Sequence, residues 1–186
     1  MIKTDQCVIR PYTTEDIESS SHHANNASIA RWLRNGFPHP YTVDDARKWI
    51  DSVLNSSPMY DYVIAVSDGT DTDQAKTTAI GGIGLKTRSD VNHRTMEIGY
   101  WLGEEYWGRG IATGVVKAFS TWTFETFPQI VRLEAEVYEG NEGSARVLTK
   151  AGYKLEGRMR KAVEKGGKIM DLLIFGLLRE DLKNEE

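Results

Sequence analysis

The chain has 186 residues, of which 40% are hydrophobic and 27% are charged, and its net charge at pH 7 is −4. This length predicts a single domain over residues 1–186, with a core over about residues 6–180 and a charged C-terminal tail over 179–186. The acidic balance and the lack of a basic block argue against nucleic acid as the main partner, and no apolar run is long enough to span a membrane. A start without an apolar leader and a lone cysteine, Cys7, predict a cytoplasmic protein.

The first third of the chain predicts one strand followed by two helices. Residues 6–10 form a short apolar run typical of a strand, and polar residues after Pro11 mark the capped start of a helix. After a loop over 35–40, Thr42 and Asp45 resemble a capping box whose acid is one methylene short. Apolar residues then recur at helical spacing, which predicts the second helix.

Three apolar runs in the middle of the chain predict strands over residues 62–66, 78–85 and 96–102. The polar segments between them are of the kind that joins antiparallel neighbours, so the three strands are expected to form a meander. The segment over 67–74 is rich in Ser, Thr, Asp and Gly and predicts a loop.

The last part of the chain alternates helices and strands. Apolar residues at helical intervals predict a long helix over 110–127, which Pro128 ends. Residues 131–138 alternate between apolar and polar, which predicts a strand with one polar face. The remaining expected elements are a helix over 141–151 closed by Gly152, a strand over 154–159, a turn over 165–168 and a strand over 169–178. The complete order, β-α-α-β-β-β-α-β-α-β-β, predicts a mixed α+β fold.

A glycine-rich turn joins the strand over 96–102 to the long helix, and it is the first candidate for a binding site. The turn ends in Trp107-Gly-Arg-Gly-Ile-Ala112. A strand that leads through such a turn into a helix directs backbone N–H groups toward one point, where a phosphate or pyrophosphate fits. The spacing matches neither the dinucleotide fingerprint nor the mononucleotide loop. The alternative is that Gly108 and Gly110 only shape a tight turn.

A second segment follows the expected strand over 131–138, namely Asn141-Glu-Gly-Ser-Ala-Arg-Val-Leu-Thr-Lys-Ala-Gly-Tyr153. Together with Ile-Gly-Tyr-Trp-Leu over 98–102 and the turn above, it resembles the GNAT acetyltransferase superfamily, and most closely its ribosomal-protein N-acetyltransferase branch. The resemblance spans nearly the whole chain. It implies a mostly antiparallel, centrally splayed sheet flanked by helices, with acetyl-CoA as co-substrate.

The resemblance also implies which residues contact acetyl-CoA. In the family, the turn wraps the pyrophosphate, the end of the preceding strand pairs with the pantetheine arm, and an N–H near Leu102 polarises the thioester carbonyl. Asn141 matches the residue that bonds the pantetheine or the neighbouring strand, with a plain helix cap as the alternative. The expected contact residues are Tyr100, Trp101, Leu102, Trp107, Gly108, Arg109, Gly110, Ile111, Ala112, Thr113, Asn141 and Ser144.

The family transfers the acetyl group by direct attack of an amine on the thioester. Many members donate a proton to the leaving thiolate from a tyrosine, but Leu148 stands at that position here, and the ribosomal-protein branch points instead to Ser144. A surface serine without a role is the alternative. Glu97 is the candidate general base, because several acetyltransferases of the superfamily carry a carboxylate at this place on the strand. An ordinary exposed strand glutamate is the alternative.

The resemblance implies a primary amine as the acceptor, either the α-amine of a protein N-terminus or a small amine. A non-catalytic module that binds acyl-CoA is the alternative from another class, and a phosphate-binding module unrelated to CoA is a third. A homodimer is possible, and no membrane partner is expected. The sequence has one cysteine and no His-x-x-x-His or Cys-x-x-Cys spacing, so no metal site is expected.

Overall fold

The computed structural model describes residues 1–67 and 77–184. The expected loop over 67–74 falls almost entirely outside the described residues, as does the end of the charged tail. The chain divides into two compact units: Met1–Gly84 with Tyr100–Ile111, and Leu85–Gly99 with Ala112–Glu186. We call them unit 1 and unit 2. The expectation of a single domain over 1–186 stays a prediction.

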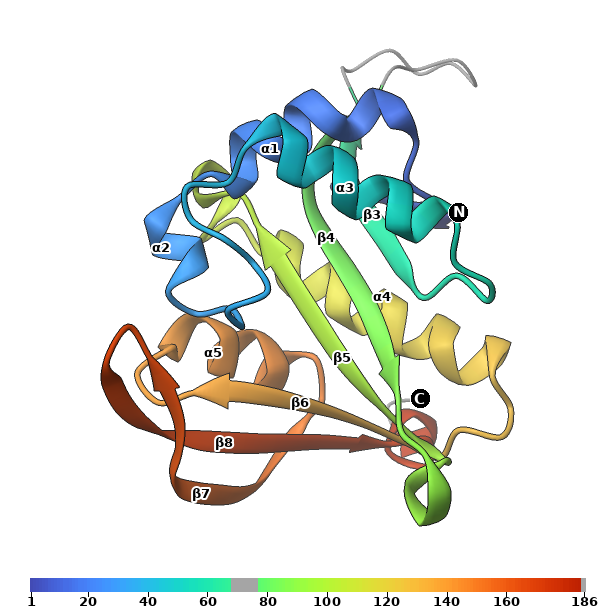
Figure 1. Ribbon diagram of the computed structural model, residues 1–186. Helices are drawn as coiled ribbons and strands as arrows, with labels where there is room; N and C mark the ends of the chain where they lie inside the picture. The colour runs from blue at the N-terminus through green and yellow to red at the C-terminus, as the bar shows by residue number, and fades with distance from the viewer. Residues whose placement is uncertain (68–76, 185–186) are drawn as a thin grey trace. The chain divides into compact units, whose positions relative to one another are not determined.

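Eight strands form a mostly antiparallel sheet in the order β1-β2-β3-β4-β5-β6-β8-β7, and helices flank it, as expected (Figure 1). The strands are β1 (Ile2–Lys3), β2 (Val8–Arg10), β3 (Asp61–Ser67), β4 (Thr77–Thr87), β5 (Thr95–Leu102), β6 (Arg132–Tyr138), β7 (Lys154–Lys165) and β8 (Lys168–Leu178). The helices are α1 (Ile17–Ala24), α2 (Ala27–Ala30), α3 (Val43–Leu54), α4 (Ile111–Thr126) and α5 (Glu142–Lys150). Within the described residues, none of these helices is long and apolar enough to cross a membrane.

Unit 1 holds β1 to β3, most of β4 and the end of β5, with α1 and α3 packed side by side (Figure 1). The capping box at the start of α3 is confirmed. The Thr42 N–H donates to the Asp45 carboxylate at 2.9 Å, and the Asp45 N–H donates to the Thr42 hydroxyl at 3.2 Å. The shorter acid therefore closes the box, and the apolar side of α3 is buried through Ala46, Ile50 and Val53.

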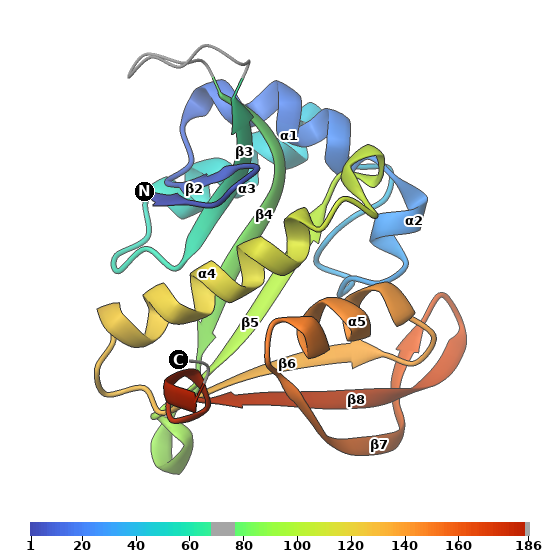
Figure 2. The same ribbon diagram turned by 180° about the vertical axis from the view of Figure 1, so that it is seen from behind.

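Unit 2 is built around β6 and β8, and α5 lies over these strands in Figure 2. The predicted alternation on β6 is confirmed, because Leu133, Ala135 and Val137 are buried while the residues between them are partly exposed. Gly152 has a φ of +94°, as expected of a residue that ends a helix in the left-handed conformation.

The parallel pairing of β5 with β6 is short. It joins Thr95 to Arg132, Met96 to Leu133 and Glu97 to Glu134, all within unit 2, and then ends although both strands continue. The other pairings given by register are antiparallel.

Three elements differ from the expectations. The two-residue β1 and the four-residue α2 were not predicted, because neither is long enough to show a periodic pattern. The strand predicted over 154–159 continues to Lys165 as β7. Most of β7 is exposed and it pairs with β8 at the edge of the sheet, so its sequence carries almost no buried apolar face to mark its length.

Candidate active site

The glycine-rich turn lies in unit 1 and has the backbone conformation that only glycine adopts readily. The φ angles of Gly108 and Gly110 are +74° and +82°. Within the described chain, a Cβ added to either glycine would meet no atom within 4 Å beyond its neighbours in sequence, so open space borders the turn. The Gln6 side-chain amide donates to the Arg109 carbonyl at 3.1 Å and holds the turn in place.

The turn runs directly into α4, which begins at Ile111. Ala112 and Thr113 form its first turn and belong to unit 2. The Arg109 guanidinium lies 5.5 Å from the centre of the Tyr106 ring, so the cation is held beside the turn. A positive side chain and the N–H groups at a helix start both favour an anion.

The end of β5, also in unit 1, directs alternate backbone groups to opposite edges. The Gly103 N–H donates to the Ile80 carbonyl on β4 at 2.8 Å. Because residues two apart on a strand direct their backbone groups to the same edge, Trp101 faces β4 as well, whereas Tyr100 and Leu102 face away from it. The expected pantetheine contacts of Tyr100, Trp101 and Leu102 stay predictions. The Leu102 carbonyl accepts the indole N–H of Trp107 at 2.8 Å.

The Trp101 side chain has a packing role in unit 1. Its ring lies 5.8 Å from that of Phe37, which in turn lies 4.8 Å from Tyr41. Tyr41 is 8% exposed and belongs to the hydrophobic core of the unit together with Tyr12. Burial raises the pKa of Tyr41 to about 12, which keeps its hydroxyl protonated at neutral pH.

The second candidate segment lies in unit 2, at the start of α5. The Asn141 side chain caps the helix, because its oxygen accepts the Ser144 N–H at 3.2 Å. The capping interpretation is thus confirmed, and a cofactor contact of Asn141 stays a prediction. Ser144 is partly exposed in the first turn of α5. Leu148 has an exposed fraction of 0% and packs in the core, and its hydrocarbon side chain has no proton to donate.

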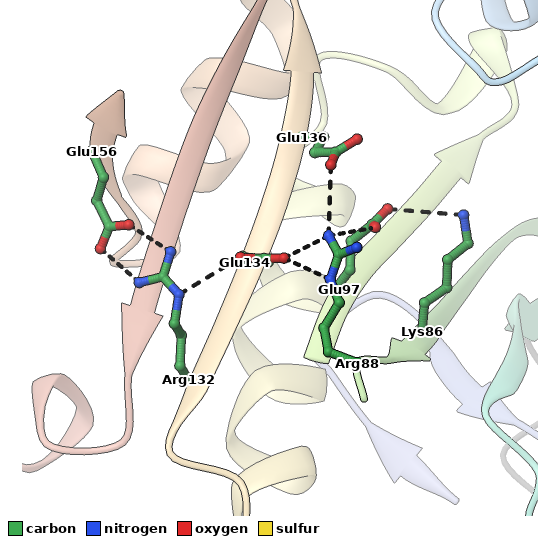
Figure 3. A network of polar contacts seen from close by, with 7 residues as sticks. All are labelled: Lys86, Arg88, Glu97, Arg132, Glu134, Glu136 and Glu156. Carbon is green, nitrogen blue, oxygen red and sulfur yellow. Dashed lines mark hydrogen bonds and ion pairs between the residues drawn. The ribbon is translucent and has the colours of Figure 1, made fainter. Parts of the chain in front are cut away.

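Glu97 on β5 belongs to a charged network within unit 2, shown in Figure 3. The network also includes residues of β4, β6 and β7. It is 6% exposed, so the alternative of an ordinary exposed glutamate is wrong. Arg88 Nη2 lies 3.3 Å from one of its carboxylate oxygens, and Lys86 Nζ lies 3.8 Å from the other. Two cations thus compensate the buried negative charge. The assignment of Glu97 as general base stays a prediction, in competition with this ion-pairing role.

Arg88 joins Glu97 to the carboxylates of β6. Its Nη2 atom lies 2.6 Å from Glu134 and 3.6 Å from Glu136. The hydrogen bond to Glu134, together with the nearby carboxylates, raises the pKa of the Arg88 guanidinium, so this side chain stays charged. Sequence reasoning missed Arg88 because it lies just after β4, outside every pattern that indicated the site.

Replacing Arg88 with Met should take from the buried Glu97 carboxylate the nearer of the two cations described above. We expect the free energy of unfolding, measured in urea, to fall by about 1 to 3 kcal/mol. Adding Glu97→Gln should recover part of this loss, because the carboxylate that faced Arg88 is then replaced by a neutral amide. Lys154→Met, which breaks the exposed pair of Lys154 with Asp181, is the matched control and should change stability far less. Equal losses in the two single variants would contradict the compensation of a buried charge.

The comparisons with known proteins agree with this arrangement. The family model of the acetyltransferase (GNAT) domain matches residues 6–154. The uncharacterized N-acetyltransferase YoaA of Bacillus subtilis (strain 168) is 25% identical over 179 residues, which are 96% of this chain and 97% of YoaA.

Solved structures show the same fold. The crystal structure of a GNAT-family acetyltransferase from Bacillus anthracis has a TM-score of 0.79 at 20% identity, covering 96% of this chain and 98% of that chain. RimL, the ribosomal L7/L12 alpha-N-protein acetyltransferase in complex with coenzyme A, has a TM-score of 0.76 at 19% identity, covering 94% and 95%. Because the family model covers most of the sequence, the chain belongs to the GNAT family and is an acetyl-CoA-dependent N-acetyltransferase.

Proposed function

We propose that the protein transfers the acetyl group of acetyl-CoA to a primary amine by direct attack in a ternary complex. The observation that carries this proposal is the turn in which Gly108 and Gly110 have φ angles of +74° and +82° and which leads into the start of α4. In the proposed complex, the turn from Trp107 to Thr113 wraps the pyrophosphate. The N–H groups of residues 108–113 bind it, because the Trp107 N–H already donates to the Glu104 carbonyl at 3.0 Å. The backbone groups of Tyr100 and Leu102 that face away from β4 form hydrogen bonds with the pantetheine arm, and the Leu102 N–H polarises the thioester carbonyl.

The transfer forms one carbon–nitrogen bond and breaks one carbon–sulfur bond. The lone pair of the neutral amine forms a bond to the thioester carbon, and the carbon–sulfur bond breaks. The nitrogen then loses one proton to water, and the CoA thiolate must receive one. We assign this proton to the hydroxyl of Ser144, which the Asn141 cap holds in the first turn of α5. Asn141 remains a proposed contact of the pantetheine through groups that its cap does not occupy.

Replacing Ser144 with Ala tests this role. We expect turnover to fall by about 100-fold or more, because general acid catalysis contributes roughly 10²- to 10⁴-fold, while the affinity for acetyl-CoA stays the same. Thr149→Ala is the matched control, since Thr149 carries an exposed hydroxyl on the same helix that bonds the Ala145 carbonyl. Turnover of Ser144→Ala equal to that of Thr149→Ala would remove Ser144 from the mechanism.

Among amines, we propose the α-amine of a protein N-terminus as the acceptor. An α-amine with a pKa near 7.8 is about one part in seven neutral at pH 7, whereas a lysine near 10.4 is only about one part in 2,500. The α-amine therefore needs little help from a base, which fits a site whose candidate base Glu97 is held by Arg88 and Lys86. The likeness to RimL, an alpha-N-protein acetyltransferase, supports the same choice.

A peptide with a free N-terminus and one internal lysine distinguishes the two kinds of amine within one molecule. After reaction with acetyl-CoA at pH 7, tandem mass spectrometry locates the acetyl group. We expect it on the N-terminal nitrogen. Acetylation of the lysine alone would contradict the choice of an α-amine and leave the acetyl transfer itself intact.

A further inference from the structure

Three metal-ligating side chains come together in unit 1. His22 and His23 lie in the last turn of α1, and Glu105 lies in the short 3₁₀ turn Glu104–Tyr106 that follows β5. Each residue offers a ligand atom within 4.8 Å of the others. Nδ1 of His23 lies 3.0 Å from a carboxylate oxygen of Glu105, and the two imidazole rings lie 4.9 Å apart, nearly at right angles.

Two imidazoles and one carboxylate form a set of ligands suited to Zn²⁺ and its neighbours among the transition metals rather than to Mg²⁺ or Ca²⁺. With metal–ligand bonds of about 2.0 to 2.1 Å, two ligand atoms in a tetrahedral site lie about 3.3 Å apart. His23 and Glu105 are already close to this separation. His22 is exposed, and its ligand atom already lies within 4.8 Å of those of His23 and Glu105.

The His23 side chain is the fixed part of this cluster. It is 9% exposed, because its ring packs against Gly103 and lies 5.5 Å from the Tyr106 ring, edge to face. A Cβ on Gly103 would come within 3.2 Å of Nδ1 of His23, so the glycine makes room for the imidazole. The ring that would carry the metal is therefore held in place before any ion binds.

The surroundings of the cluster favour a cation. A cavity of about 450 Å³ borders it, and the side chains that line this cavity are His22, His23, Asn25, Asn26, Glu104 and Glu105. This lining carries two carboxylates and neither lysine nor arginine. The cluster also lies at the C-terminal end of α1, where the helix dipole stabilises positive charge. Asn26 donates to the Glu104 carboxylate at 2.6 Å and holds this second acid at the rim.

We propose that His22, His23 and Glu105 form a binding site for a divalent transition-metal ion of the Zn²⁺ class, with water from the cavity as the remaining ligand. Such an ion would join the end of α1 to the 3₁₀ turn that leads into Trp107 to Ile111, all within unit 1. The proposal departs from the expectation of no metal site. That expectation relied on the spacing of His and Cys along the chain, and such spacing cannot reveal a third ligand that comes from a distant segment.

Calorimetric titration of the full chain, without any polyhistidine tag, with Zn²⁺ tests the proposal. We expect one ion per chain, and a loss of affinity of about tenfold or more in both His22→Ala and Glu105→Gln. Both side chains are exposed, so these variants should fold, and far-ultraviolet circular dichroism checks that they do. His39→Ala and His93→Ala remove the other two of the four histidines and should bind Zn²⁺ as the original chain does.

Two further measurements separate this site from other causes of Zn²⁺ binding. Co²⁺ should give the visible absorption bands of a protein-bound ion, and Glu105→Gln should weaken them. Cys7→Ala should retain the affinity for Zn²⁺, because Cys7 is buried and takes no part in the cluster. Equal affinities for Zn²⁺ in the original chain, His22→Ala and Glu105→Gln would overturn the proposal, and so would loss of binding in Cys7→Ala.

Discussion

Gly110→Glu is expected to abolish the binding of acetyl-CoA. The φ angle of Gly110 is +82°, a conformation that strains any residue with a Cβ, and the added carboxylate would stand in the open space beside the turn. This space is where we place the pyrophosphate, so bulk and like charge both act against it. Calorimetric titration with acetyl-CoA should detect no binding at concentrations that saturate the original protein.

The control for this prediction is the same substitution at another glycine with a positive φ angle. Gly166 lies in the turn between β7 and β8 with a φ of +57°, and a Cβ there would also meet no atom within 4 Å among the described residues beyond its chain neighbours. Gly166→Glu should therefore lose some stability and keep its affinity for acetyl-CoA. If Gly110→Glu binds acetyl-CoA as tightly as Gly166→Glu does, the pyrophosphate is not bound at this turn.

Gly81→Ala is expected to cause the largest loss of stability among single-methyl additions to the sheet. Gly81 lies on β4, and a Cβ there would overlap the carbonyl oxygen of Trp101 and come within 3.1 Å of the Leu102 Cα. Both are backbone atoms of β5, so no side-chain rotation relieves the overlap. The strands must move apart at the end of β5 that carries the proposed pantetheine contacts.

We expect Gly81→Ala to lower the free energy of unfolding by about 3 kcal/mol. For a chain of this size, that loss lowers the melting temperature by roughly 6 to 12 °C. Gly36→Ala is the control, because a Cβ at Gly36 meets no atom within 4 Å in the described structure beyond its chain neighbours. A melting temperature of Gly81→Ala within 1 to 2 °C of the Gly36→Ala value, roughly the shift of a neutral substitution, would show that β4 and β5 do not approach so closely.

Elements with strong local signals could be predicted from the sequence. The acid of Asp45 three residues after Thr42 marked the start of α3, and the alternation from Leu133 to Val137 marked β6 with its buried and polar faces. Such signals depend on neighbours in the chain. By contrast, β7 is an exposed edge strand whose extent depends on pairing with β8, so its length could not be predicted from apolar residues.

The candidate site, too, could be predicted from the sequence only where the signal is local. The glycines at 108 and 110 indicated a tight turn before a helix, and their positive φ angles agree with it. The edge to which each residue of 100–102 directs its backbone groups could not be predicted, because it depends on register and not on residue type. The cations beside Glu97 were also missed, since Arg88 reaches it from a segment that showed no pattern.

The most direct test of the central claim is a search for the acceptor by mass spectrometry. The protein is incubated with acetyl-CoA and a pool of peptides with free N-termini, lysine peptides and small amines, and Gly110→Glu serves as the blank. We predict that a defined amine gains one acetyl group, that an equal amount of CoA is released, and that the blank forms no product. Binding of acetyl-CoA by the original protein without acetylation of any amine would contradict this account and favour a module that only binds acyl-CoA.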